Sequence, residues 1–243
     1  MARIFITGSA DGLGWAAAQT LLGDGHEVIV HARSPERLAA VDDLVGRRAS
    51  AVVGDLAELD QTRAVADQVN QLGRVDAVIH NAGVYSGPHI VPVNIVAPYL
   101  LTAFIHRPQR LVYLSSGAHY GGRADLAGLD WSGQRKTGSY SDSKLFVTTL
   151  AVAVARIWPD VYSNAVDPGW VPTKMGGPGA PDDLRLGHLT QEWLATSDER
   201  RARSSGGYWF HQRLRTPHPA VNNTHFQNEL LNALAQFTGV PLA

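Results

Sequence analysis

A tyrosine and a lysine stand four residues apart in the segment YSDSK, as Tyr140 and Lys144. Residues i and i+4 share one face of a helix, so both side chains could point into one cleft. A free tyrosine has a pKa of about 10, and a nearby ammonium group lowers that pKa by favouring the phenolate. The pair could therefore exchange a proton with a carbonyl or alcohol oxygen. Because this spacing also arises by chance, the surrounding sequence must decide whether the pair is functional.

A serine at the end of an apolar run could supply the second group that carbonyl chemistry needs. Ser116 follows the predicted strand 110–115, and its hydroxyl could donate a hydrogen bond to a substrate oxygen. Tyr140 would then act as the acid or base, and a cofactor would carry the hydride. His119 stands three residues after Ser116, but the sequence has no G-x-S-x-G segment, so hydrolysis is rejected. We interpret His119 as a loop or pocket residue.

The segment TGSADGLG, residues 7–14, predicts a phosphate-binding turn between a strand and a helix. Gly8 would let the chain turn sharply, Gly12 would let the backbone approach a phosphate, and Gly14 would let the helix pack closely. The amides at the helix start would face a pyrophosphate, although the spacing G-x-x-x-G-x-G differs from the commoner G-x-G-x-x-G and an ordinary turn is the alternative. The turn residues predicted to bind a dinucleotide are Gly8, Ser9, Asp11, Gly12, Leu13 and Gly14.

The end of the second predicted strand indicates which dinucleotide would bind. In VIVHARSPERL, Ala32 occupies the position where NAD-binding chains carry an acidic residue, and Arg33 follows it. A guanidinium can hold a phosphate with two hydrogen bonds, so the sequence favours NADP(H), with NAD(H) as the alternative. A solvated surface arginine is the other interpretation of Arg33, and the anionic Asp11 opposes the assignment to NADP(H).

Short apolar runs alternate with helical stretches along the chain. The runs show little alternation of inward and outward residues, which is typical of parallel strands that are covered on both faces. This order predicts a Rossmann-type doubly wound parallel sheet in a three-layer α/β/α arrangement. The predicted strands are 3–7, 27–31, 49–53, 75–80, 110–115 and 162–167. The predicted helices are 15–22, 35–45, 61–72, 93–104 and 141–158.

From Gly169 the sequence becomes rich in Gly and Pro, which predicts a loop. A helical patch follows near residues 189–195, SSGGYWF is a candidate last strand, and NELLNALAQFTG predicts a terminal helix that ends at Gly239. We expect one domain, residues 1–243, in which residues 170–205 form the substrate-binding loop and helix.

Several motifs occur in one order: TGSADGLG, GDL at 54–56, NAG at 81–83, LSS at 114–116, YSDSK, and DPGWVPT at 167–173. Together they resemble the short-chain dehydrogenase/reductase family over nearly the whole chain. The long gap between Ser116 and Tyr140 and the tail GGYWF…PHPAVNN…LLNALAQFTG resemble its retinol-dehydrogenase-like branch. The resemblance implies an NAD(P)-dependent oxidoreductase that acts on a small-molecule carbonyl or alcohol and forms a homodimer or homotetramer through its long helices.

The resemblance also implies roles at matching positions. Ser116, Tyr140 and Lys144 would be catalytic, with Lys144 also binding the nicotinamide ribose, and Asn94 would support a proton-relay water. Two departures bear on Asn94 and its surroundings: His80 stands where an asparagine often precedes NAG, and only 13 residues separate Asn81 from Asn94. The further positions that the resemblance places at the cofactor are Asp55, Leu56, Asn81, Ala82, Gly83, Pro168, Gly169, Val171 and Thr173.

Composition excludes several other classes of function. A formal net charge of −1 gives no electrostatic reason to expect nucleic acid or an anionic membrane as a partner. The chain has no cysteine, which excludes disulfides and thiolate chemistry and fits a cytoplasmic protein, as does the absence of a signal-peptide pattern before the first strand. The apolar run 145–158 is too short to span a bilayer. The ten histidines show no zinc-binding spacing, so no metal is expected.

Two other functions use the same fold. A non-catalytic sensor that binds NADP(H) is the main alternative, because fold does not fix function and the segment before Asn94 is short. An epimerase or dehydratase with the same Tyr/Lys pair fits the glycine spacing and the chain length less well.

Overall fold

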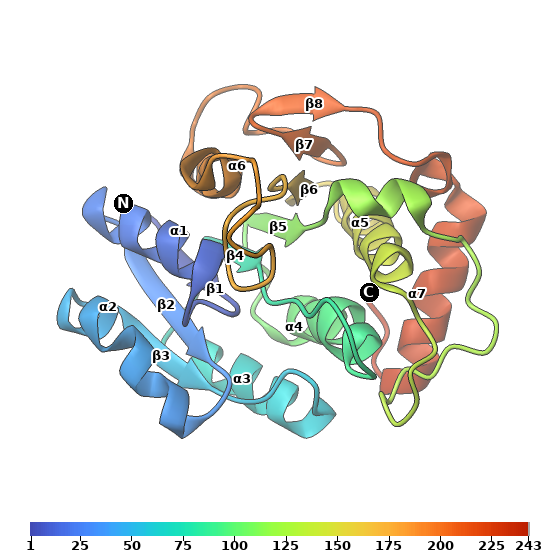
Figure 1. The fold of residues 1–243 in the computed structure, drawn as a ribbon, viewed down its shortest axis with the longest axis horizontal. Coiled ribbons are helices and arrows are strands. Elements are labelled where there is room, and N and C mark those ends of the chain that lie inside the picture. Colours follow the sequence, from blue (N-terminus) through green and yellow to red (C-terminus); the bar gives the residue numbers. More distant parts are fainter. Residues whose placement is uncertain (243) are drawn as a thin grey trace.

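The computed structural model describes residues 1–242, and within them eight strands form one sheet in the order β3-β2-β1-β4-β5-β6-β7-β8 (Figure 1). The strands from β1 to β7 run parallel, and β8 pairs antiparallel with β7. The order reverses at β1, where β4 lies on the other side of β1 from β2, and ligands bind at such a reversal in open α/β sheets. The strands are β1 (Arg3–Ile6), β2 (Glu27–Ala32), β3 (Ser50–Val53), β4 (Ala77–His80), β5 (Arg110–Leu114), β6 (Tyr162–Asp167), β7 (Tyr208–Phe210) and β8 (Arg213–Arg215).

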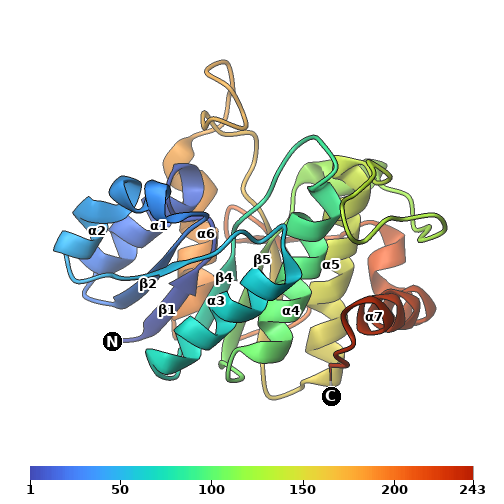
Figure 2. The same ribbon diagram turned by 90° about the horizontal axis from the view of Figure 1, so that it is seen from below.

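Helices cover both faces of the sheet. In β1, Ile4 and Ile6 pack into a core that includes residues of α1 and α6, whereas Phe5 points to the opposite core, with residues of α3, α4, α5 and α7. Figure 2 looks onto the side on which α3, α4 and α5 lie. The helices are α1 (Gly12–Gly23), α2 (Asp42–Gly46), α3 (Leu59–Gln71), α4 (Ala97–Phe104), α5 (Tyr140–Ile157), α6 (Leu184–Thr196) and α7 (Thr224–Thr238). The predicted three-layer doubly wound fold is confirmed.

All six strands predicted in the first part of the chain are present within two residues of their expected ends. The helix predicted at 35–45 is instead a 3₁₀ segment, η1 (Pro35–Val41), followed by the short α2. Only Val41 and Leu44 of these two segments are buried, so little apolar surface stabilises a longer helix. The helix predicted at 93–104 begins as a π-helical turn, η2 (Pro92–Val96). Pro98 has no amide hydrogen for the carbonyl of Asn94, so the regular bonding ladder is interrupted there.

The strand β8 was not predicted, because RLR shows no apolar alternation and all three residues are exposed. It forms through a two-residue hairpin turn in which His211 and Gln212 adopt φ angles of 47° and 58°. Asn-Gly or Asp-Gly usually marks such a turn in a sequence, and the HQ pair carries no such signal.

Helix α5 begins at Tyr140 because of the residues on either side of it. The Ser139 hydroxyl accepts a hydrogen bond from the amide of Asp142 at 3.0 Å, and the Asp142 carboxylate accepts one from the amide of Ser139 at 3.1 Å. This capping box occupies amides at the helix N-terminus that would otherwise lack a partner. Tyr140 is therefore fixed in the first turn of α5, and Lys144 lies one turn further along the same face.

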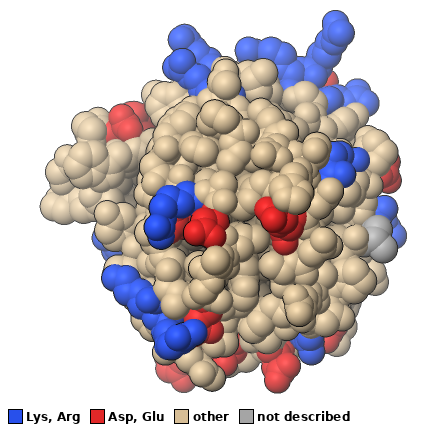
Figure 3. Space-filling view, turned by 90° about the vertical axis from the view of Figure 1, so that its right-hand side faces the viewer, with Lys and Arg blue, Asp and Glu red and all other residues tan. Residues whose placement is uncertain are grey.

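The C-terminal segment covers the long helices. Residues 142–151 of α5 are buried throughout, and α7 packs beside α5 in both ribbon views (Figures 1 and 2). The Tyr99 hydroxyl of α4 donates to the carbonyl of Val240 at 2.6 Å. Figure 3 shows that the outer surface on this side is mostly uncharged. A homo-oligomer stays a prediction, and the buried central part of α5 could not contribute to its interface.

Candidate active site

The glycine-rich turn joins β1 to α1 in a conformation that its glycines require. Gly8 has a φ of +63°, and a Cβ atom there would lie 2.9 Å from the Cα of Ala82. Gly12 has a φ of +56°, a left-handed conformation that side chains disfavour. A Cβ atom on Gly14 would collide with the side-chain nitrogen of Asn81 and the carbonyl of Gly8. Gly8 and Gly14 therefore permit close packing inside the turn, whereas Gly12 leaves its backbone open to the cleft.

Replacement of Gly8 by alanine is expected to lower the free energy of unfolding by about 3 kcal/mol or more, because it adds a clash with the backbone to the cost of a positive φ. Gly25→Ala is the matched control, since Gly25 has a φ of +83° and a Cβ atom there would meet no other atom within 4 Å. We expect Gly25→Ala to cost about 1–2 kcal/mol. Denaturant unfolding of both variants measures the difference, and equal losses would show that the Ala82 contact is unimportant.

Buried polar groups hold the turn in place from β2 and β4. The amide of Gly8 donates to Nδ1 of His31 at 3.0 Å, so Nε2 of His31 carries the proton that is shared with the carbonyl of Gly54 at 2.8 Å. Burial lowers the pKa of His31, which fits a neutral ring with these two partners. The Thr7 hydroxyl accepts from the amides of Asn81 and Ala82, both at 2.9 Å. The NAG segment therefore positions the turn.

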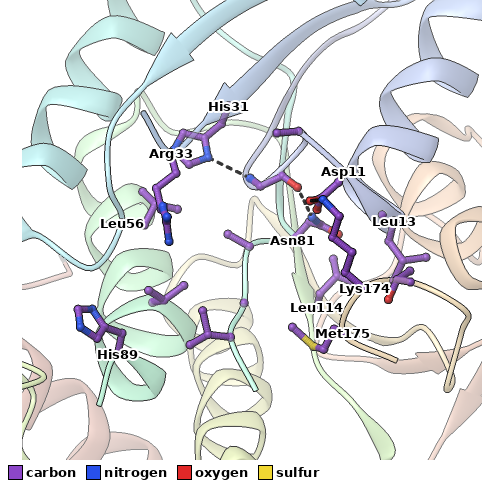
Figure 4. A pocket seen from close by; sticks show the side chains of 18 of the residues that line it. Asp11, Leu13, His31, Arg33, Leu56, Asn81, His89, Leu114, Lys174 and Met175 are labelled. Carbon is purple, nitrogen blue, oxygen red and sulfur yellow. Dashed lines mark hydrogen bonds and ion pairs between the residues drawn. The ribbon is translucent and has the colours of Figure 1, made fainter. Parts of the chain in front are cut away.

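A cleft of about 730 Å³ extends from this turn across the carboxyl ends of the strands (Figure 4). That volume lies in the range of small-molecule and cofactor sites, about 300–1,000 Å³. The sequence-predicted site residues that line the cleft are Gly8, Asp11, Gly12, Leu13, Arg33, Asp55, Leu56, Asn81, Ala82, Gly83, Tyr140, Lys144, Pro168 and Thr173.

Six predicted site residues do not line the cleft: Ser9, Gly14, Asn94, Ser116, Gly169 and Val171. Ser9 is fully buried, and its hydroxyl donates to the carbonyl of Ile6 at 2.9 Å and accepts from the amide of His31 at 2.7 Å. Its role is to tie the turn to β2, and the neighbouring Ala10 lines the cleft in its place. The side chain of Val171 is buried as well.

Asp11 is paired with two cations that the sequence analysis did not identify. Its carboxylate oxygen Oδ2 lies 2.8 Å from Nζ of Lys174 and 3.1 Å from a terminal nitrogen of Arg37. Figure 4 shows the Lys174 side chain reaching Asp11 from the loop after β6. The described residues that line the cleft include four Lys and Arg side chains but only two carboxylates. The predicted conflict between Asp11 and a phosphate at Arg33 therefore disappears, because the Asp11 charge is balanced.

Arg33 extends into solvent at the end of the cleft near Leu56, on the other side of the turn from Lys174 (Figure 4). Its side chain is 74% exposed, and its Nε lies 3.9 Å from a carboxylate oxygen of Asp55. An exposed ion pair at this distance is weak, so the guanidinium is free to bind an anion. Arg37 could have been found in the sequence, because it lies only four residues after Arg33. Lys174 carries no comparable signal.

At the other end of the cleft, α5 and the end of β5 bring the predicted catalytic side chains together. The Ser116 side chain lies close enough to the Tyr140 hydroxyl to lower its pKa. Ser116 begins a short 3₁₀ turn, η3 (Gly117–Gly121), and its hydroxyl oxygen accepts from the amide of Ala118 at 3.2 Å. Lys144 is buried, and its Nζ donates to the carbonyl of Leu114 at 2.7 Å. Serine, tyrosine and lysine thus form one cluster at the carboxyl ends of the parallel strands.

The acidity of this cluster differs from the sequence-based expectation. Burial raises the pKa of Tyr140 to about 12, and the Ser116 side chain only partly opposes this effect. Lys144 is not among the groups that shift this pKa in the structure, where burial has the largest effect, so its predicted influence on Tyr140 stays a prediction. The Lys144 ammonium is bound to the carbonyl of Leu114 and lies 5.5 Å from the centre of the Tyr140 ring, so it does not contact the hydroxyl. Burial also lowers the pKa of Lys144 itself to about 8.

Asn94 links the segment after β4 to α5. Its side-chain oxygen accepts from the amide of Val84 at 2.8 Å, and its nitrogen donates to the carbonyl of Val84 at 3.0 Å and to the Ser143 hydroxyl at 2.9 Å. A Cβ atom on Gly83 would lie 3.4 Å from Asn94 and 3.6 Å from Nζ of Lys144. Asn94 and Lys144 therefore both border Gly83, and Asn94, in its π-helical turn, also reaches α5 through Ser143.

His119 differs most from its interpretation as a loop or pocket residue. The ring is fully buried, its Nδ1 lies 2.8 Å from the carbonyl of Ser116, and its Nε2 accepts from the amide of His218 at 3.0 Å. The Tyr120 hydroxyl adds a bond to the carbonyl of Thr216 at 2.6 Å. The turn that carries Ser116 is thereby fixed to the segment before α7, a contact across about a hundred residues that no local pattern predicts.

Metal ligands do not cluster in the part of the chain that the structure describes. Residues 1–242 hold no group of three or more His, Cys, Asp or Glu side chains that could bind a metal ion. No helix among the same residues is long and apolar enough to cross a membrane.

Residues 2–104 match the family model described as short chain dehydrogenase. The chain is 37% identical to an uncharacterized oxidoreductase, AN7799, of Emericella nidulans, over 99% of this chain and 98% of that protein. It is 35% identical to the short-chain dehydrogenase chyC of Penicillium rubens, over 100% of this chain and 99% of that protein. It is also similar to human retinol dehydrogenase 13, at 30% identity over 71% of this chain and 60% of that protein.

Solved structures share the fold at lower sequence identity. A crystal structure of an uncharacterized protein from Mycobacterium paratuberculosis superimposes with a TM-score of 0.82 at 22% identity, covering 100% of this chain and 95% of that chain. A blue fluorescent protein from a metagenomic library, crystallised in complex with NADPH, gives a TM-score of 0.70 at 22% identity, covering 86% of this chain and 95% of that chain.

Proposed function

Because the chain belongs to the short-chain dehydrogenase/reductase family of NAD(P)-dependent oxidoreductases, we propose that it transfers a hydride between NADP(H) and a carbonyl or alcohol, with Tyr140 as the acid or base. The observation that carries this proposal is that Tyr140 and Lys144 line one end of a cleft that begins at the glycine-rich turn, with Ser116 beside Tyr140. A sensor without catalysis would not require a serine hydroxyl beside a tyrosine hydroxyl at this position.

The residues that line the cleft could contact every part of a bound dinucleotide. The open backbone at Gly12 and the N-terminus of α1 would take the pyrophosphate, and Asp55 with Leu56 would border the adenine. Lys144 and Pro168 would lie beside the nicotinamide end. When bound there, the nicotinamide supplies or accepts the hydride.

The proton chemistry belongs to the chain's own side chains. In the reducing direction, the Tyr140 hydroxyl donates its proton to the carbonyl oxygen, and the Ser116 hydroxyl donates a hydrogen bond to the same oxygen. Lys144 places a cation behind the phenol ring, where it favours the phenolate that remains after proton donation. In the oxidising direction the same groups act in reverse, and the phenolate accepts the alcohol proton.

The preference for NADP(H) rests on the cations at the adenosine end. Arg33 is free to bind a phosphate, and Arg37 and Lys174 balance the charge of Asp11 in the turn. The structural neighbour that contains NADPH agrees with this preference, although its likeness to this chain concerns the fold. An arginine fork matches the geometry of a 2′-phosphate, which NADP(H) has and NAD(H) lacks.

The substrate would enter between the cleft and residues 170–205, the region that we propose as its binding site. Trp170 and Met175 in this region are 60% and 48% exposed, and Tyr85 is 64% exposed with its ring centre 4.9 Å from that of Tyr140. Exposed apolar side chains beside a catalytic group favour a substrate with an apolar or aromatic body.

A panel of aliphatic and aromatic ketones, aldehydes and alcohols, each assayed with NADPH and NADH, tests the proposal. We expect consumption of NADPH with at least one carbonyl, and faster turnover with NADPH than with NADH. Cofactor binding is measured separately by fluorescence titration. Tight NADPH binding without consumption across the whole panel would contradict the proposal and support the sensor instead.

A further inference from the structure

A carboxylate that the proposed mechanism does not use lies beside the catalytic cluster. Asp167 ends β6, which pairs with β5 so that Val166 stands opposite Leu114, two residues before Ser116. One oxygen of the Asp167 carboxylate accepts from the Tyr208 hydroxyl at 3.0 Å, and the other accepts from the amide of Gly169 at 3.0 Å. The carboxylate is half-buried and held from two sides, so its position is fixed.

The same carboxylate is directed toward the turn that carries Ser116. A Cβ atom on Gly117 would lie 3.2 Å from the Asp167 oxygen that Tyr208 binds. The negative charge contributes to raising the pKa of both Tyr140 and Lys144; it adds to the larger effect of burial at Tyr140 and opposes it at Lys144. Asp167 therefore acts electrostatically on both ionisable members of the cluster.

We propose that Asp167 is a positioning residue whose fixed negative charge keeps the proton on Tyr140 and the positive charge on Lys144, which prepares the site to donate a proton to a carbonyl. This inference rests on the proposed function, in which Tyr140 is the proton donor. It adds a fourth residue to the site, which acts through Tyr140 and Lys144.

The other groups around Asp167 do not replace its charge. Tyr208 from β7 is a neutral donor whose pKa is raised by burial and by Asp167. Burial lowers the pKa of His119 from η3, and both ring nitrogens are occupied by Ser116 and by the amide of His218. The His119 ring is therefore neutral and cannot cancel the carboxylate.

Two further groups, Asp182 and Tyr85, lie near Asp167 and Tyr140. Asp182, in the loop after β6, accepts from the amide of Trp170 at 2.6 Å and adjoins Gly169, so it adds negative charge further from Tyr140. Tyr85 lies over the Tyr140 ring and also raises its pKa. Lys144 from α5 is the cation whose pKa Asp167 raises, and the groups that shift the pKa of Tyr140 include no cation of the described residues.

Removal of the Asp167 charge should shift the pKa values of Tyr140 and Lys144 in the same direction. Removal of a negative charge makes the phenolate less unfavourable and the ammonium less favourable, so the pKa values of Tyr140 and Lys144 both fall. Carbonyl reduction needs the protonated phenol, so its activity should then be lost at a lower pH. Alcohol oxidation needs the phenolate, so its activity should begin at a lower pH.

The test compares pH profiles of Asp167→Asn, Asp167→Glu and Asp60→Asn with the wild type, using the carbonyl of the panel that is reduced fastest with NADPH. On the alkaline side of each pH profile, reductase activity falls as Tyr140 loses its proton, and we call this fall the alkaline limb. In Asp167→Asn we expect the alkaline limb to lie about one pH unit lower, because a nearby negative charge has been removed. Asp167→Glu should restore the limb, and Asp60→Asn, an exposed carboxylate on α3, should leave it unchanged. An unmoved limb in Asp167→Asn, or a limb that moves upward, would overturn the inference.

A second measurement does not depend on turnover. The tyrosinate absorbance of Tyr140 is obtained as the difference between each variant and the same variant carrying Tyr140→Phe. When this absorbance is titrated against pH, its midpoint should lie at a lower pH in Asp167→Asn than in the wild type. If Asp167→Asn does not fold, Asp167→Ser keeps an acceptor for Gly169 and Tyr208 and takes its place. Failure of the proposed function is distinguishable, because Tyr140→Phe would then retain turnover, whereas failure of this inference leaves Tyr140→Phe inactive and the Asp167 profiles unchanged.

Discussion

Replacement of Tyr140 by phenylalanine is expected to lower the rate of carbonyl reduction by about a thousandfold, because general acid catalysis contributes about 10²–10⁴-fold. The substitution removes only the hydroxyl, and the ring stays packed beside Lys144 and Tyr85. The affinity for NADPH should change by less than about threefold, since the predicted phosphate and adenosine contacts lie at the other end of the cleft. Turnover and fluorescence titration of the purified variant measure the two effects.

Tyr85→Phe is the matched control for this experiment. Tyr85 is a second tyrosine at the same site, and its ring centre lies 4.9 Å from that of Tyr140, but the hydroxyl whose pKa Ser116 affects belongs to Tyr140. We expect Tyr85→Phe to keep most of the wild-type rate. Unchanged turnover in Tyr140→Phe would remove the central assignment, and equal losses in both variants would point to packing and not to proton transfer.

Replacement of Arg33 by alanine is expected to weaken NADPH binding by roughly 10–100-fold, the equivalent of about 1.5–3 kcal/mol for hydrogen bonds to a charged group. NADH lacks the 2′-phosphate, so its affinity should change by less than about threefold on the same argument. The side chain makes one weak exposed ion pair with Asp55, so the substitution should cost little stability. Titration of both cofactors against wild type and variant gives the two ratios.

Arg33→Lys separates charge from geometry. Lysine keeps the positive charge but cannot form the two parallel hydrogen bonds of a guanidinium, so we expect a loss of NADPH affinity between those of the wild type and Arg33→Ala. Equal losses for NADPH and NADH in Arg33→Ala would contradict a 2′-phosphate site at this position. In that case Arg37 and Lys174 would be the cations to replace next, because both line the cleft and hold Asp11.

The sequence was sufficient wherever the deciding contacts are local. The run of short apolar strands follows from the burial of both sheet faces, and the start of α5 follows from Ser139 and Asp142 three residues apart. Gly8 and Gly12 adopt the positive φ angles that a sharp turn requires. The end of α7 at Gly239 is confirmed for the same reason, since its φ is +72°.

Sequence reasoning failed wherever the deciding partner lies far along the chain. Asp11 is an unbalanced anion of the phosphate turn in the sequence, but in the fold Lys174, 163 residues away, lies beside it. His119 is a loop residue by its local pattern, and its two partners are the carbonyl of Ser116 and the amide of His218. Ser9 matches a binding motif, yet its side chain holds the turn to β2.

The YSDSK segment by itself determined which two side chains share the first turns of a helix, because i and i+4 spacing and the capping residues are local properties. Only the tertiary structure decided their acidity. Burial in the fold raises the pKa of Tyr140, the carbonyl of Leu114 holds Lys144 away from the hydroxyl, and Asp167 is contributed by the neighbouring strand. Electrostatic effects depend on distance through space and on exclusion of water, and neither is a function of spacing along the chain.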